Sequence, residues 1–295
     1  MICTLGDLLL DVIVRVPSGV GSTEPPRSGA RGFAGGGSGI ELARGADTPA
    51  ETRIASGGQA ANVAAWAVEL GEDARFVGKL GGDAAGELAR SLLERRGVEV
   101  SGPRAGGRTG VVVALVGPDG ERSMATDRGV SPELRADELD PSWFAGCSWL
   151  HLSGYSLLAE PIAEAALAAA RCARVAGARV SVDLSSWSAI RARGPAEFRA
   201  RLEELGPDVV FANEPEWELV GASYSLAETS VLKRGSRGVV VHGPDGSEQH
   251  AALGGDVLDT TGAGDALAAG FIVGGIELGL EAAARCVAQL GAVPA

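Results

Sequence analysis

The stretch that decides the fold is Asp259-Thr260-Thr261-Gly262-Ala263-Gly264-Asp265, near the end of a chain of 295 residues. It follows a short β-like run, Val257-Leu258, and precedes the small residues 266–271, which are typical of a closely packed helix. A Gly-Ala-Gly backbone carries no bulky side chain that would keep an anion away. Its N–H groups would lie at a helix N-terminus, where the dipole favours negative charge. The stretch therefore predicts an anion site at the start of a helix.

Asp265 closes this stretch and has two interpretations. A carboxylate repels phosphate, so we expect it to act as a base beside a phosphate that is being transferred. The alternative is a helix cap, because Asp and Gly-rich turns are common at helix starts. The stretch alone does not decide between the two.

A second segment favours the catalytic interpretation. Gly57-Gly58-Gln59-Ala60-Ala61-Asn62 also joins a strand-like run to a helix, and Gly71 and Gly81 follow it. Further matches, in chain order, are Gly6-Asp7 with Asp11, Asn213-Glu214-Pro215-Glu216 and Lys233-Arg234-Gly235-Ser236-Arg237-Gly238. Together these motifs resemble the ribokinase-like (PfkB) carbohydrate kinase family. Each motif is weak alone, but their common order from residue 2 to about residue 292 is a strong signal.

The resemblance implies an ATP-dependent phosphotransferase. Asp265 would take the proton of the acceptor hydroxyl, while Gly262, Ala263 and Gly264 supply the N–H groups of an anion hole. Removing one such donor typically costs about 10²–10³ in rate. Asp259 and Thr261 would be ligands of a monovalent cation, with K⁺ expected, although turn formation is the simpler role for Asp259.

On the acceptor side, the resemblance makes Asp11 the group that accepts hydrogen bonds from two sugar hydroxyls. An ionised carboxylate makes the stronger hydrogen bonds. Gly57 and Gly58 would let the substrate approach the backbone, and Asn62 offers both a donor and an acceptor to a polyol. The alternatives are an exposed charge at a strand end for Asp11 and a helix-start residue for Asn62.

On the nucleotide side, Asn213 and Glu216 resemble the pair that holds Mg²⁺ through waters, a mode that suits an ion that keeps its hydration shell. Lys233, Gly235 and Gly238 lie where the family meets the nucleotide. A surface ion pair is the alternative for Glu216. Many relatives carry Asp-Pro-Asn where this chain has Asp183-Leu184-Ser185, so the acceptor is left open.

Strand-like and helical runs alternate along most of the chain, which favours an α/β doubly wound, mostly parallel sheet with helices on both faces. Strands without intervening helices, at about 11–17, 52–57 and 109–127, predict a small antiparallel β lid. Gly117-Pro118-Asp119-Gly120 is a hairpin signal within it. The Gly- and Ser-rich segment 18–44 is expected to be a flexible insertion. We predict one ribokinase-like domain over 1–295, with a possible homodimer through the lid.

Composition excludes several classes of protein. The net charge of −12 argues against a nucleic-acid partner, and no run of 18 apolar residues predicts a membrane span. With no signal peptide in the pattern, we expect a cytoplasmic protein. The four cysteines, Cys3, Cys147, Cys172 and Cys286, have no metal-like spacing and are expected to be buried free thiols. His151 lies in an apolar run and is expected to be a core residue.

We therefore predict a kinase that phosphorylates a hydroxymethyl group of a small sugar. Two alternatives stay open. A nucleoside kinase of the same fold would need an aromatic slot for its base, and only 4% of the residues are aromatic. A non-catalytic sugar-binding regulatory module would not need Asp265 beside the glycines.

Overall fold

The computed structural model describes residues 1–16, 42–43, 45–117, 122–221 and 226–295. Its main element is a nine-stranded sheet in the order β15-β14-β13-β12-β11-β10-β1-β4-β6. The strands from β6 to β13 are parallel, and β14 and β15 are antiparallel to their neighbours. The strands are β1 Ile2–Leu5, β4 Ala74–Val77, β6 Glu99–Ser101, β10 Trp149–Ser153, β11 Arg179–Asp183, β12 Val209–Asn213, β13 Thr229–Lys233, β14 Val239–Gly243 and β15 Gly246–His250.

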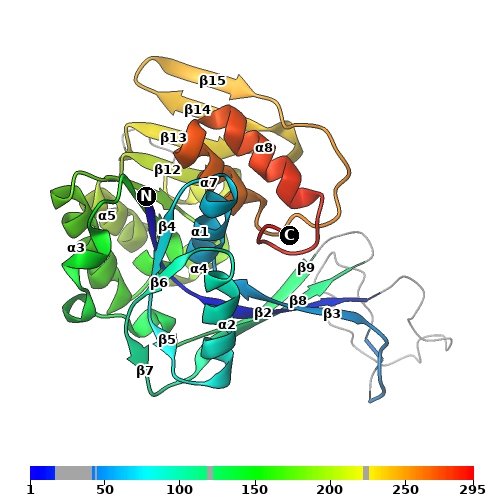
Figure 1. Ribbon diagram of the computed structural model, residues 1–295. Helices are drawn as coiled ribbons and strands as arrows, with labels where there is room; N and C mark the ends of the chain where they lie inside the picture. The colour runs from blue at the N-terminus through cyan, green and yellow to red at the C-terminus, as the bar shows by residue number, and fades with distance from the viewer. Residues whose placement is uncertain (17–41, 44, 118–121, 222–225) are drawn as a thin grey trace.

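Helices cover both faces of this sheet (Figure 1). One face packs against α1 Gln59–Glu69, α2 Ala84–Glu94, α7 Ala263–Gly274 and α8 Ile276–Val287. The other packs against α3 Ile162–Val175, α4 Trp187–Arg193, α5 Pro195–Leu205 and α6 Glu214–Leu219. The central strands read as apolar runs because both of their faces are buried. The expected doubly wound α/β fold is confirmed.

A second, four-stranded sheet extends from one end of the large sheet (Figure 1). It contains β2 Leu9–Arg15, β3 Glu51–Gly57, β8 Thr109–Val116 and β9 Arg122–Gly129, in the order β3-β2-β8-β9. The two outer pairings are antiparallel and the central pairing of β2 with β8 is parallel. This sheet is the predicted lid; the expected insertion 18–44, apart from residues 42 and 43, and most of the turn 117–120 lie outside the described residues.

Short elements complete the connections. Strands β5 Leu80–Gly81 and β7 Arg104–Ala105 form a two-stranded parallel pair. Single 3₁₀ turns are η1 Ser131–Glu133, η2 Ala136–Glu138, η3 Pro141–Phe144, η4 Gly154–Leu157 and η6 Gly235–Arg237. No helix within the described ranges is long and apolar enough to cross a membrane.

The expected β-like run before the Gly-Ala-Gly stretch is not a strand. Val257 and Leu258 lie in irregular backbone and are 65% and 40% exposed. The Leu258 N–H donates to the Val287 carbonyl at the end of α8 (2.7 Å) rather than to a neighbouring strand. Two consecutive apolar residues therefore gave a wrong strand prediction, because neither one is buried in a sheet.

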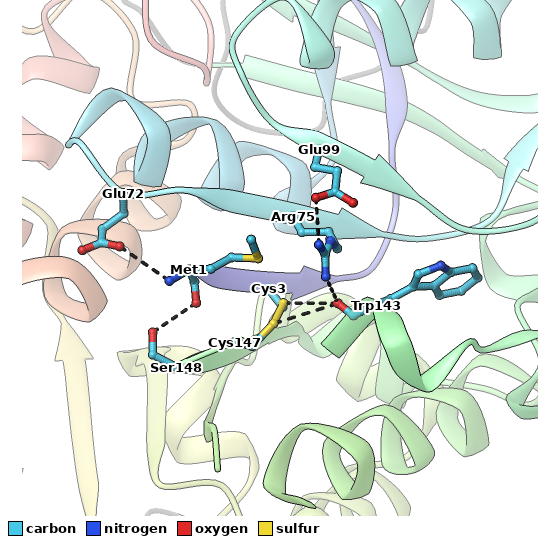
Figure 2. Close-up of a disulfide and its surroundings, with 8 residues drawn as sticks. All are labelled: Met1, Cys3, Glu72, Arg75, Glu99, Trp143, Cys147 and Ser148. Atoms are coloured by element: carbon cyan, nitrogen blue, oxygen red, sulfur yellow. Dashed lines mark hydrogen bonds and ion pairs between the residues drawn. A yellow bond between two sulfur atoms is a disulfide. The ribbon is translucent and has the colours of Figure 1, made fainter. Parts of the chain in front are cut away.

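The expectation of four buried free thiols is also wrong. Cys3 in β1 and Cys147, just before β10, form a disulfide with a Cα–Cα distance of 5.9 Å (Figure 2). The two cysteines are 144 residues apart, but β1 and β10 are paired neighbours in the sheet, with Ile2 opposite Trp149. Spacing along the chain could not show this contact. Cys172 is only half-buried, whereas Cys286 is buried and donates to the Thr261 carbonyl (3.2 Å).

Candidate active site

The Gly-Ala-Gly stretch begins helix α7 as predicted. Gly262 is the N-cap and has a left-handed backbone, with φ of 79°. A Cβ on Gly262 would lie 2.6 Å from the Cα of Ala292, so only glycine fits this turn. The N–H groups of the first helical turn have no partner within the helix. Such N–H groups make the start of a helix favourable for an anion, although the Ala263 N–H also donates to the Thr260 carbonyl (3.4 Å).

Asp265 lies in this first turn and is half-buried. The Asn62 side chain, from helix α1, donates from Nδ2 to Oδ2 of Asp265 at 2.8 Å. Two candidate residues that are 203 positions apart are therefore in direct contact. Asn62 is 5% exposed, and its Oδ1 has no partner among the described residues. The contact joins the predicted acceptor loop to the predicted base.

Asp11 lies on β2 and points over the glycine loop. A Cβ on Gly57 would fall 2.1 Å from the Cγ and Oδ1 of Asp11, so the carboxyl group occupies the space of a missing side chain. Gly58 has φ of 98°, and a Cβ there would lie 2.2 Å from the Asp7 carbonyl oxygen. Burial raises the pKa of Asp11 from its ordinary 3.8 to about 7. Its Oδ1 is buried without a partner in the described part of the chain.

Lys233, at the end of β13, is the centre of a charged cluster. Its Nζ donates to Oδ2 of Asp183 at the end of β11, which lies two strands away across β12 (2.5 Å). A Cβ on Gly264 would lie 3.1 Å from the same Nζ, so the ammonium group approaches the start of α7 where no side chain intervenes. Burial lowers the pKa of Lys233, but Asp183, Glu216 and Asp265 outweigh it and raise the pKa. The lysine stays charged.

Asn213 and Glu216 form a capping box at the start of α6. The Asn213 Oδ1 accepts from the Glu216 N–H (2.9 Å), and the Glu216 carboxylate accepts from the Asn213 N–H and Nδ2 (both 2.9 Å). Glu216 is 2% exposed, so the surface ion pair considered for it is excluded. Burial raises its pKa, and the charge of Asp183 adds to the effect against that of Lys233.

These carboxylate and amide oxygens are hard donors of the kind that Mg²⁺ prefers. Within the described residues, no group of three or more His, Cys, Asp and Glu side chains is arranged to hold a metal directly. The donor set therefore fits an ion that arrives with nucleotide phosphates and is held through water.

Asp259 is a buried carboxylate, 1% exposed, just before α7. Its Oδ1 accepts from the Thr261 N–H (2.8 Å) and hydroxyl (2.5 Å), and its Oδ2 accepts from the Gly291 N–H (2.9 Å). Over the residues that the structure describes, no lysine or arginine pairs with it. The turn role is thus real, and the buried negative charge lacks a cationic side chain.

Gly235 and Gly238 shape the loop between β13 and β14. Gly238 has φ of 82°, and a Cβ there would lie 2.0 Å from the His250 carbonyl oxygen. Arg234 and Arg237 both form ion pairs with Glu214 of α6, on the outside of this loop. The structure therefore places the loop beside Asn213 and Lys233, at the carboxyl ends of β12 and β13.

Two charged pairs were not found from the sequence. Asp183 was noted only as part of a segment that departs from the family, and its pairing with Lys233 depends on the order of β11, β12 and β13. Arg128, at the end of β9, forms a two-point ion pair with Asp7 (2.6 and 2.9 Å). The available signal was a charged residue at or near the end of a strand. His151 is a core residue as expected: burial lowers its pKa to about 4, and it contacts the Ser181 hydroxyl (2.9 Å).

The fold and this arrangement define a class of protein, and comparison with known proteins agrees. Residues 38–294 match the family described as pfkB family carbohydrate kinase, so the chain belongs to that family. The predicted class, an ATP-dependent sugar kinase, is confirmed.

Particular relatives differ in the acceptor that their names give. The chain is 37% identical over 249 residues to an ATP-dependent ribose-1-phosphate kinase from Halopiger xanaduensis, which covers 79% of each chain. It is 31% identical over 242 residues to a fructokinase from Escherichia coli, covering 76% of this chain and 78% of the relative.

Solved structures show the same fold. An adenosine kinase from Sinorhizobium meliloti superposes with a TM-score of 0.81 at 26% identity, over 99% of this chain and 95% of that one. A putative ribokinase II from E. coli, solved with ATP and Mg²⁺, gives a TM-score of 0.76 at 19% identity, over 99% and 94% of the two chains. The latter likeness establishes the fold alone.

Proposed function

We propose that this protein transfers the γ-phosphate of ATP to a hydroxymethyl group of a small sugar, with Asp265 as the base. The observation that carries the proposal is the hydrogen bond from Asn62 to Asp265, which joins the acceptor loop to the start of α7. The acceptor oxygen bonds to the γ-phosphorus and the bond to the bridging oxygen breaks. ADP then leaves, and the hydroxyl proton passes to Asp265.

The acceptor side has the polarity that a polyol requires. Asp11 Oδ1 and Asn62 Oδ1 are buried acceptors without partners in the described chain. An unpaired buried acceptor costs about 1–3 kcal/mol. Sugar hydroxyls would donate to both oxygens and remove this cost, while Gly57 and Gly58 leave room beside the backbone. The proposal therefore gives each orphan oxygen a partner.

The donor side has the polarity that ATP requires. The N–H groups of Gly262, Ala263 and Gly264 would face the transferred phosphoryl group, with the Lys233 ammonium beside them. Asn213 and Glu216 would hold Mg²⁺ through waters, and the ion would neutralise charge on the phosphates. Gly235 and Gly238 would border the rest of the nucleotide. The use of ATP supports action in the cytoplasm.

Asp259 supports a monovalent cation close to α7. A buried carboxylate without a cationic side chain is costly, and a K⁺ ion beside it would compensate the charge. Thr261 lies next to the same carboxylate, and its carbonyl oxygen is a second possible ligand for such an ion. This ion would add to the positive field at the start of the helix.

The lid supports a homodimer. The side of the small sheet away from Asp11 carries Val12, Val14, Ile54, Val113 and Leu115, which the strand register places side by side. The valines and Leu115 are half-buried, and Ile54 is 52% exposed. Two copies that pair through this face would bury it. Light scattering of the wild type and of Ile54→Glu tests this, since the variant should be monomeric.

A nucleoside acceptor is the second candidate, because the adenosine kinase structure superposes on this chain at 26% identity. Trp187, at the start of α4 and 46% exposed, is an aromatic side chain that a base could contact. A nucleoside presents the same hydroxymethyl group as a furanose, so the chemistry at Asp265 would be unchanged.

An ADP-release screen over free sugars, sugar phosphates and nucleosides tests the proposed function. We expect turnover of at least one sugar with Mg²⁺ and none in excess chelator. Asp265→Asn is the matched negative control in every well. Turnover of nucleosides alone would favour the second candidate, and binding of sugars without turnover would indicate the regulatory module.

A further inference from the structure

Arg128 is held in one orientation at the base of the lid. Its Nε donates to Asp7 Oδ2 (2.6 Å), and its Nη2 donates to Asp7 Oδ1 (2.9 Å) and to the Tyr155 carbonyl (3.3 Å). The guanidinium also lies over the Tyr155 ring, 5.2 Å from its centroid. Asp7 is 4% exposed. A two-point pair with a buried carboxylate fixes both the position and the plane of the guanidinium.

One edge of this guanidinium is not used. Within the described chain, Nη1 of Arg128 donates to no partner, while the side chain as a whole is 20% exposed. The pair with Asp7 is neutral as a unit, but the N–H groups of Nη1 still carry positive charge outward. An oriented guanidinium with free donors is a group that binds phosphate or carboxylate oxygens.

Arg128 lies on the acceptor side of the site. It stands between Asp127, which pairs with Val111, and Gly129, which pairs with Thr109, so it lies opposite Gly110. A Cβ on Gly110 would lie 2.4 Å from the Leu9 side chain, which places Leu9 and Arg128 in one row across the lid. Asp11 is two residues further along β2, on the same face.

The distance between the two residues suits one small ligand. Two strand spacings and two residues along a strand separate the Cα atoms of Asp11 and Arg128 by about 12 Å. The Asp11 carboxyl group lies over Gly57 of β3, and the Arg128 guanidinium lies against Asp7 and Tyr155. Asp7, the partner of Arg128, also lies against the glycine loop, because a Cβ on Gly58 would be 2.2 Å from the Asp7 carbonyl oxygen. Asp11 and Arg128 are therefore two polar groups on the same face of the lid sheet.

We propose that Arg128 is a specificity-determining residue that recognises a phosphate group already present on the acceptor sugar. The acceptor would thus be a sugar monophosphate, and the product a bisphosphate. A neutral sugar has no group that requires a guanidinium with free donors. The inference rests on the proposed function, and one relative of this chain is named for a phosphorylated acceptor, ribose 1-phosphate.

A purely structural role predicts different behaviour. If Arg128 only fastens the lid to Asp7, its loss would impair every acceptor by the same factor. If it binds the phosphate of the acceptor, its loss would fall mainly on the phosphorylated one. The ratio of the two kcat/KM values separates these roles.

The experiment compares ribose 1-phosphate with ribose in the wild type, in Arg128→Lys and in Asp7→Asn combined with Arg128→Gln. The double variant leaves no buried charge unpaired and keeps a pair that can hydrogen bond. Arg108→Gln is the control, since Arg108 is a lid arginine with a 78% exposed side chain that pairs with Asp127. Thermal melting checks the fold of each variant.

We expect the wild type to favour ribose 1-phosphate, and the double variant to lower the kcat/KM ratio of ribose 1-phosphate to ribose by about 10–100-fold, the loss of one charged hydrogen bond or more. Arg128→Lys should lower this kcat/KM ratio by a smaller factor, because lysine keeps the positive charge but lacks the planar set of guanidinium N–H groups. Arg108→Gln should leave the ratio unchanged. An unchanged ratio in the double variant would overturn the proposal.

Binding separates this inference from the proposed function. Calorimetric titration of ribose 1-phosphate into the protein without nucleotide needs no turnover. A protein that turns over no acceptor, yet binds ribose 1-phosphate in an Arg128-dependent way, would refute the kinase assignment and keep the role of Arg128. Equal binding by the wild type and the double variant would refute that role whatever the activity.

Discussion

The donor side and the acceptor side of the site differ in how far the protein alone satisfies them. On the donor side, the Lys233 ammonium already has Asp183 as its partner at 2.5 Å, and Glu216 is fully engaged by Asn213. On the acceptor side, Asp11 and Asn62 each keep a buried oxygen without a partner in the described chain. The polar groups on the donor side are therefore paired within the protein, whereas those on the acceptor side have acceptor oxygens that a ligand can pair with.

This difference has a physical reason. The donor side must hold one charge pattern for every turnover, and paired charges fixed at the ends of β11, β12 and β13 provide it. The acceptor side must exchange substrate and product, and groups that are unsatisfied in the free protein bind a polyol without first breaking internal bonds. Six measurements would break or sharpen the comparison.

The largest expected effect is on catalysis by Asp265. Asp265→Asn should lower kcat by about 10²–10⁴ with little change in either KM, because the amide cannot accept the hydroxyl proton. Asn keeps the size of the side chain and can still cap the helix. ADP release, nucleotide titration and thermal melting of the variant are compared with those of Asp245→Asn, an exposed turn residue. A folded variant within a few fold of the wild type would return Asp265 to the role of a helix cap.

The donor side should depend strongly on its ion pair for stability. Lys233→Met leaves Asp183, which is 1% exposed, without its partner and should lower the free energy of unfolding by about 3–5 kcal/mol. Urea unfolding measures the loss. Combining Lys233→Met with Asp183→Asn removes both charges and should recover part of it. Normal stability of the single variant would contradict the idea that the donor side is satisfied internally.

The acceptor side should behave in the opposite way. Asp11→Ala should raise the KM for the sugar far more than the KM for ATP, since each lost charged hydrogen bond is worth about 1.5–3 kcal/mol. Two lost bonds correspond to a factor of about a hundred or more. Steady-state kinetics with each substrate varied in turn gives both constants. A loss of ATP affinity with unchanged sugar affinity would show that the two sides are assigned backwards.

The raised pKa of Asp11 predicts a pH dependence. The folded protein holds this proton up to pH of about 7, whereas the unfolded chain releases it near 3.8. The contribution of Asp11 to stability therefore falls as pH rises through this window and is constant above it. Asp11→Asn should remove that fall, and at pH 8 its melting temperature should equal or exceed that of the wild type.

Binding should show the reverse trend, because the ionised carboxylate makes the stronger hydrogen bonds. For the wild type, kcat/KM for the sugar should rise by up to about tenfold per pH unit towards pH 7 and then level off. A profile that is flat between pH 5.5 and 8 in the wild type would contradict a protonated Asp11 in the free enzyme.

The smallest expected effect is that of the monovalent cation at Asp259. Activity should be highest in K⁺ salts and lower in Na⁺ or choline salts of equal ionic strength, because a K⁺ ion beside the carboxylate would compensate its buried charge. Asp259→Asn should lose this preference. Equal rates in all three salts would leave Asp259 with its turn role alone.

The sequence predicted the regular parts of this molecule well. Arg179–Asp183 alternates valine with polar residues, Val209–Asn213 begins with four apolar residues, and both lie between helices, so each was predicted as a strand. The Gly-Ala-Gly helix start was predicted because Gly262 needs a backbone that other residues avoid. Strand β15, Gly-Ser-Glu-Gln-His, was not predicted, since an exposed edge strand has no apolar pattern.

Contacts between distant segments could not be predicted in the same way. The pairs Asp183–Lys233, Asp7–Arg128 and Cys3–Cys147 depend on which strands are neighbours and in what register. Local patterns contain neither. The resemblance to a family placed the site residues near each other but gave no information on these pairs.

The hydrogen bond between Asn62 and Asp265 joins the two halves of the sequence at the candidate active site. The chain could therefore be divided into two fragments that each carry part of the site. The acceptor groups Asp11, Gly57, Gly58, Asn62 and Arg128 come from the first half of the sequence, and the donor-side groups come from the second. Neither half expressed alone would contain a complete site, so turnover by two mixed fragments would report that they had associated. If each fragment were fused to a different protein, binding of those two proteins to each other would be measured as release of ADP.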